Sequence, residues 1–106
     1  MNFREELVKV RQEHRFSVES KANRFLFDAL VELRKKPFYE DEKLALFATR
    51  DKIILKLVDG PDIFKAWFIN SVEADVVFDL IVKKLKNDGC RVNNPNSYRH
   101  FVILED

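Results

Sequence analysis

The sequence predicts one α+β domain, 1–106, with an N-terminal helical region, a three-stranded antiparallel meander, one further helix and one or two more strands on the sheet. Two observations predict this class. Apolar residues recur at helical spacing over 1–36 and 72–87, whereas they alternate in short runs over 44–69. A chain of 106 residues has the length of one domain, and it can bury a core without disulfides or metals.

The N-terminal region predicts either a helical hairpin or one long helix. In the hairpin, a helix over 3–16 is followed by Ser17, which caps a second helix over 18–36, and Pro37 ends that helix. In the single helix, apolar positions separated by eleven residues keep one stripe along a nearly straight axis. Neither Gly nor Pro interrupts this region, so the sequence leaves both arrangements open.

Three strands are predicted over 44–49, 53–58 and 63–69, where apolar residues stand at alternate positions. A polar pair follows the first strand, and the turn sequence Asp-Gly-Pro-Asp follows the second. These short connections predict an antiparallel meander. Residues 41–50 also have the composition of a helix, so a helix in place of the first strand remains an alternative.

A clear helix is predicted over 72–87, because its apolar residues form one stripe and its charges complement the helix dipole. Asn70 or Ser71 can cap its start, and Gly89 ends it. Two short strands are expected after this helix, over 90–92 and 98–104.

The predicted sheet is apolar on both faces. In the second strand Ile53 and Leu55 stand opposite Ile54, and in the third strand Trp67 stands opposite Phe68. An antiparallel sheet with one face in water normally alternates apolar and polar residues cleanly. We therefore expect both faces to be covered, one by the helix over 72–87 and the other by the N-terminal helical region, a second copy or a partner.

These surfaces indicate a small intracellular protein-binding or regulatory module without an active site. The expected partner-binding residues are Phe3, Leu7 and Val10 on the N-terminal helix and Trp67 on the sheet. A partner protein or a second copy of the chain, in a homodimer, would cover them.

The alternative function is nucleic-acid binding, because basic residues cluster near two helix ends and Arg99 lies in the last predicted strand. Helix, three strands, helix is also the element order of double-stranded RNA-binding domains. Such domains carry lysines at the start of their last helix, whereas Glu73 and Asp75 stand there in this chain. The candidate contacts of this alternative are Arg34, Lys35, Lys36, Lys83, Lys84, Lys86 and Arg99.

The sequence contains no recognisable catalytic, metal or phosphate-binding motif. One cysteine, Cys90, and two histidines stand at no ligand spacing, and two glycines cannot form a phosphate loop. We expect no metal, no cofactor and no enzymatic activity. Acid–base chemistry would need separated residues to converge, of which the candidates are Glu40, Asp79, Arg99 and His100.

Composition and the first residues predict a cytoplasmic protein. The start MNFREELVKV is charged and lacks the apolar segment of a signal peptide, and no apolar run is long enough to span a membrane. A single cysteine fits a reducing compartment. The net charge of +1 creates no general attraction for polyanions.

Overall fold

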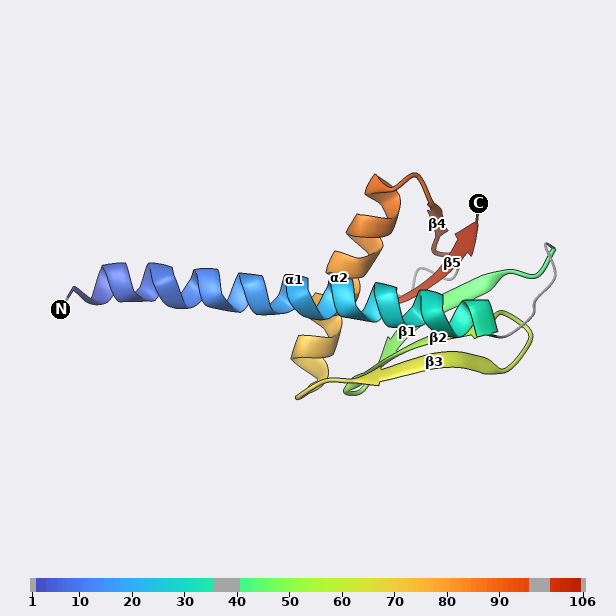
Figure 1. Cartoon of the computed structure of the whole chain (residues 1–106), viewed down its shortest axis with the longest axis horizontal. Helices are drawn as coiled ribbons and strands as arrows, with labels where there is room; N and C mark the ends of the chain where they lie inside the picture. The colour runs from blue at the N-terminus through green and yellow to red at the C-terminus, as the bar shows by residue number, and fades with distance from the viewer. Residues whose placement is uncertain (1, 36–40, 96–99, 106) are drawn as a thin grey trace.

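The computed structural model describes residues 2–35, 41–95 and 100–105. Two helices and five strands form the predicted α+β fold, and both of the additional strands predicted after the second helix are present (Figure 1). The elements in chain order are α1 (Phe3–Lys35), β1 (Leu44–Thr49), β2 (Lys52–Leu57), β3 (Asp62–Trp67), α2 (Ser71–Asn87), β4 (Arg91–Asn93) and β5 (Phe101–Glu105).

The N-terminal region is one continuous helix, α1, so the single-helix alternative is confirmed and the predicted break at Ser17 is wrong. Without Gly or Pro, nothing in this stretch interrupts the backbone hydrogen bonds, and Ser17 is tolerated inside the helix. The N-cap lies at the far end instead, where the backbone N–H of Arg4 donates to Asn2 Oδ1 at 2.9 Å. Glu5 and Glu6 add favourable charge to the first turn.

The meander is confirmed, and residues 44–49 form β1 rather than a helix. The five strands are antiparallel in the order β3-β2-β1-β5-β4. Two residues connect β1 to β2, and Arg50 among them has a φ of 56°, in the left-handed region that favours glycine. The polar pair therefore forms a turn at some cost in backbone strain.

Helix α2 begins and ends as its sequence predicts. The side chain of Asn70 accepts the backbone N–H of Glu73 at 2.9 Å, which is an N-cap. After the last turn Gly89 adopts a φ of 92°, which only glycine tolerates readily. The N–H of Cys90 then donates to the carbonyl of Leu85 at 3.0 Å and closes the helix end.

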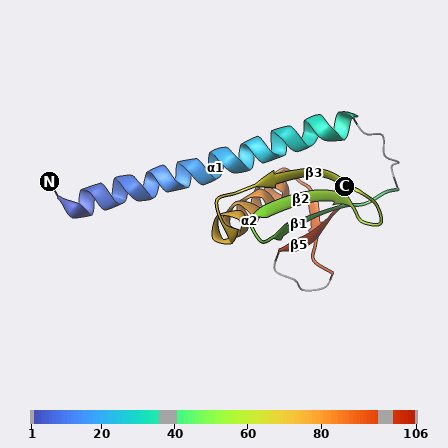
Figure 2. The same ribbon diagram turned by 90° about the horizontal axis from the view of Figure 1, so that it is seen from below.

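Both helices pack on the same face of the sheet and share one core with it. Residues paired across strands share a face, so Leu46, Leu55 and Val102 form one group through their cross-strand partners. They belong to the same buried cluster as Phe25 of α1 and Phe78 of α2. Figure 2 shows α1 along the β3 side of the sheet.

The second face of the sheet carries Phe47, Ile54 and Phe101, and no helix of the described chain lies on it. Of the three covers that the sequence left open for this face, the N-terminal helix is therefore excluded, and a second copy or a partner remains untested. The face partly covers itself: Ile54 is 5% exposed, and Lys52 and Lys56, which flank it on β2, are half-buried. Lysine stems shield apolar neighbours while the ammonium groups stay in water, which is why two-sided apolar alternation does not require a second helix.

Candidate functional site

The N-terminal part of α1 projects away from the rest of the molecule. We call residues 3–17 the arm and the remainder of α1, residues 18–35, the docked half. Along the arm every residue is exposed except Leu7, which is half-buried, whereas the first fully buried residue of α1 is Ala22. Figures 1 and 2 show the arm reaching past α2 and the sheet from both directions of view. No other element of the described chain covers it.

The arm carries most of the partner-binding residues that the sequence predicts. Phe3 is 79% exposed at its start, and Leu7 and Val10 follow at helical spacing. Trp67, at the end of β3, is 65% exposed and belongs to the body rather than the arm. Val8 and Phe16 are also exposed on the arm, but on other sides of the helix from this stripe.

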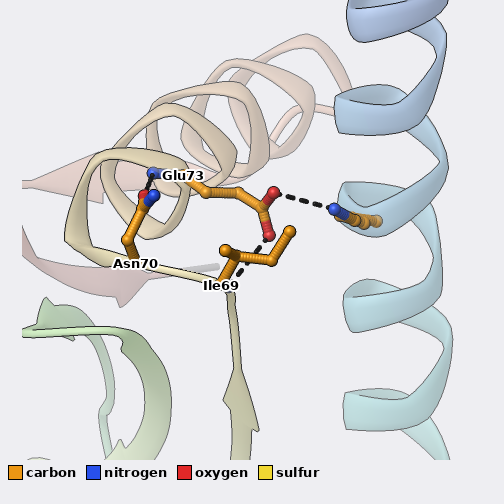
Figure 3. Close-up of polar contacts among 4 residues, drawn as sticks. Ile69, Asn70 and Glu73 are labelled. Atoms are coloured by element: carbon orange, nitrogen blue, oxygen red, sulfur yellow. Dashed lines mark hydrogen bonds and ion pairs between the residues drawn. The ribbon is translucent and has the colours of Figure 1, made fainter.

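An ion pair ties α1 to α2 where the arm leaves the body. Lys21 Nζ lies 2.8 Å from Glu73 Oε2, and the backbone N–H of Ile69 donates to Glu73 Oε1 at 3.3 Å. Figure 3 shows Glu73 between α1 and the start of α2, with Ile69 and Asn70 beside it. The hydrogen bond from Lys21, more than any other contact, holds the pKa of Glu73 below its usual value. The two helices thus contact each other at this point through a partly exposed ion pair.

The junction between β3 and α2, residues 67–73, lies in line with the apolar stripe of the arm. Positions 7, 14 and 21 are spaced by seven residues and share one side of a helix, and Lys21 contacts this junction directly. A groove of about 420 Å³ runs between α1 and the junction. Exposed apolar side chains gather at the junction, namely Trp67, Ile69 and Val72.

The residues of the nucleic-acid alternative lie at the ends of two helices. Arg34 and Lys35 are exposed at the end of α1, and Lys83 and Lys86 are exposed near the end of α2, with Lys84 half-buried. Figure 1 shows these two helix ends pointing in different directions. Lys36 and Arg99 lie outside the described residues.

Two of the four residues considered for acid–base chemistry lie together. His100 Nε2 is 3.5 Å from Asp79 Oδ1, and its Nδ1 is 3.5 Å from Asp75 Oδ1. The ring of Phe78 meets the imidazole edge-on at 5.3 Å. Glu40 and Arg99 lie outside the described residues, so their part in such a group stays untested. Both contacts are long, and Nε2 of His100 is buried without a hydrogen-bond partner among the described residues. Sequence reasoning missed Asp75 as a neighbour of His100.

The described residues contain no group of three or more His, Cys, Asp or Glu side chains placed to hold a metal ion. Sequence reasoning also missed the ion pair at the base of the arm. The sequence indicates only that Glu73 lies at the start of a helix. Nothing in the local sequence of Lys21 predicts a contact with a residue 52 positions away.

No family model matches the chain, and no curated protein or solved structure is similar to it at a significant level. Among the described residues, no helix is long and apolar enough to cross a membrane.

Proposed function

We propose that this protein is a small, non-enzymatic protein-binding module of the cytoplasm, and that it self-associates through its arm. The arm supports this proposal because it leaves the body as a helix with an apolar stripe that the described chain does not cover. A solvent-exposed helical segment of about this length is marginal in water without packing. A second helix along the stripe stabilises it.

The stripe has the spacing of a short coiled-coil seam. Phe3 and Val10 take the d positions of a heptad, and Leu7 and His14 take the a positions. Apolar side chains thus fill three of the four seam layers from Phe3 to His14, and Ser17 takes the next d position. Val8 and Phe16 fall outside the seam, and isolated exposed apolar residues of this kind need no partner.

Charges beside the seam favour a second copy of the chain as the partner, in parallel orientation. Arg4 and Arg11 line one edge, at the e positions, and Glu6 and Glu13 line the other, at the g positions. In a parallel pair, Glu6 of each copy faces Arg11 of the other. In an antiparallel pair with the same seam, arginines face arginines and glutamates face glutamates, which is unfavourable.

The body limits the length of such a pair. At Lys21 the side of α1 that carries the seam is occupied by the β3–α2 junction of the same chain. The α1 helices of the two copies must therefore diverge at about Val18. Divergence brings the exposed junction residues Ile69 and Val72 of both copies toward the opening between the two α1 helices. Trp67 pairs with Lys52 on the face of the sheet opposite to the helices, so it remains a separate candidate contact outside this seam.

Light scattering tests the association. We expect the wild type to have the mass of a dimer, and Leu7→Asp to have that of a monomer, because a carboxylate in the seam is desolvated without a partner. Gln12→Asp, on the opposite side of the arm, is the matched control and should remain a dimer. A wild type that is monomeric at high concentration would contradict the proposal.

Disulfide trapping tests the orientation. In a Cys90→Ser background, Phe3→Cys should form an intermolecular disulfide, because the two position-3 side chains meet in a parallel pair. In an antiparallel pair they would be about 16 Å apart, too far for a disulfide. A disulfide that forms only between a Phe3→Cys chain and a His14→Cys chain would show antiparallel pairing instead.

A further inference from the structure

A cavity of about 800 Å³ lies between the two helices and the sheet, and no residue of the arm lines it. Its volume falls in the range of roughly 300–1,000 Å³ that small-molecule sites occupy. The lining is mainly apolar, with Ala29 and Leu33 from α1, Ile81 and Leu85 from α2, and Leu46 and Leu55 from the sheet.

The geometry of the two helices explains the cavity. Ala22 and Ala74 follow the paired residues Lys21 and Glu73 directly, and both alanines are fully buried. Small side chains at this point let the helices approach closely. Leu33 and Leu85 each lie eleven residues further on, about 16 Å along the axis and on the same side of their helices. The helices diverge over this length, and the space between them is the cavity.

Polar groups stand at the entrance. Asp41, Glu42 and Lys43 precede β1, and Glu105 ends β5. Lys43 Nζ lies 3.4 Å from Glu105 Oε1, so this ammonium group already has a carboxylate partner. Among the described lining residues the remaining charge is negative, which disfavours an anionic ligand.

Glu42 provides a second and independent observation. Its Oε2 atom has less than 1 Å² of exposed surface, and it has no hydrogen-bond partner in the described part of the chain. A buried carboxylate oxygen without a donor is unfavourable. The Glu42 side chain also lines the cavity, so a cationic head group in the cavity can pair with its carboxylate.

We propose that the cavity binds a small amphiphile with an apolar chain and a cationic amine head, with Glu42 receiving the head group. The chain fills the space lined by Leu33, Leu85 and Leu104. The ammonium group pairs with the Glu42 carboxylate and offsets the negative charge of the described lining residues. This site does not depend on self-association, since no residue of the arm lines it.

Isothermal titration on the full chain, with dodecylamine below its micelle concentration, tests the proposal. We expect saturable binding of one molecule per chain and at least about tenfold weaker binding of dodecanoate, because its head group carries the opposite charge. Butylamine, which has the same head without the chain, should not bind measurably. Equal or tighter binding of dodecanoate, or no saturable binding of dodecylamine, would overturn the proposal.

Two variants locate the bound molecule. Glu42→Gln should weaken dodecylamine binding about tenfold or more and leave dodecanol binding unchanged, because only the charged head loses its partner. Leu30→Trp, at the half-exposed rim of the cavity, should block both ligands. Phe27→Trp, on an exposed side of α1 outside the cavity lining, is the matched control. Equal dodecylamine binding by the two tryptophan variants would place the ligand elsewhere and refute the assignment.

Discussion

The two halves of α1 belong to one uninterrupted helix, yet they have opposite environments. In the docked half Ala22, Phe25 and Ala29 are buried, whereas no residue of the arm is. Both halves carry apolar stripes and both carry charges of each sign. The apolar stripe alone therefore does not reveal which half packs against its own chain.

Side-chain size distinguishes the halves better than hydrophobicity. Ala22 is the first alanine in the chain, and the buried side of the docked half alternates alanine with phenylalanine. Alanine lets α1 approach α2 closely, and Phe25 fills the remaining space against Phe64 at a ring distance of 5.2 Å. The arm offers larger side chains, which suit a seam with another helix rather than close contact with a sheet.

The two halves of α1 should differ most in the free energy of unfolding that is lost when a phenylalanine in each half is replaced by alanine. Phe25 is 3% exposed and Phe16 is 77% exposed. We expect Phe25→Ala to lower the free energy of unfolding by about 3–5 kcal/mol through lost burial and a new void. Phe16→Ala should change it by less than about 0.5 kcal/mol. Urea denaturation followed by circular dichroism measures both, and similar losses for the two variants would mean that the arm is packed.

The two halves should differ less in stability when an exposed residue of each is replaced by glycine, which lowers helix propensity. Arg24 in the docked half and Gln12 in the arm are both exposed, and both are good helix formers. Arg24→Gly should cost about 1 kcal/mol in the free energy of unfolding, because the docked half must be helical to pack. At protein concentrations low enough to keep the chain monomeric, Gln12→Gly should leave the melting temperature unchanged and only reduce helical ellipticity. A matching loss of stability in both variants would show that the arm unfolds together with the body.

Much of the fold follows from local sequence, because its determinants are local. Asn70 and Gly89 mark the ends of α2, and alternating residues give the meander. The continuity of α1 was left open, since Ser17 is compatible both with a cap and with a helix interior. The sequence left open whether the N-terminal helix, a second copy or a partner covers the second face of the sheet. The half-burial of Lys52 and Lys56, which flank Ile54 on that face, does not follow from the pattern of apolar residues.

The candidate site was predicted only where its residues form a helical stripe. Phe3, Leu7 and Val10 were identified from their spacing, and the structure leaves them on the arm as one group. The cavity was not predicted, because it arises from the divergence of two helices that are far apart in sequence. Glu42 follows Glu40 and Asp41 in a short acidic run, and nothing in that local sequence indicates that its side chain lines a cavity.

The smallest expected effect concerns the ion pair that separates the two halves of α1. The pKa of Glu73 is lowered, chiefly by its hydrogen bond from Lys21. A carboxyl group with a lowered pKa in the folded state stabilises that state above its unfolded pKa of about 4.3. The stabilisation is lost as the pH falls through the lowered folded value. Since Lys21 is about one-third exposed, solvent screens the pair, and we expect about 1 kcal/mol or less.

Denaturation of the wild type and of Glu73→Gln at several pH values measures this contribution. The difference in the free energy of unfolding should be greatest near neutral pH and should shrink as the pH falls through the lowered folded pKa of Glu73, because the wild-type carboxylate is then protonated as well. Glu19→Gln, on the exposed surface of the docked half, is the control and should show no such dependence. A difference that grows as the pH falls would contradict the sign of the pKa change. A difference that is constant with pH would assign the effect of the substitution to the Ile69 hydrogen bond and packing rather than to the charge on Glu73.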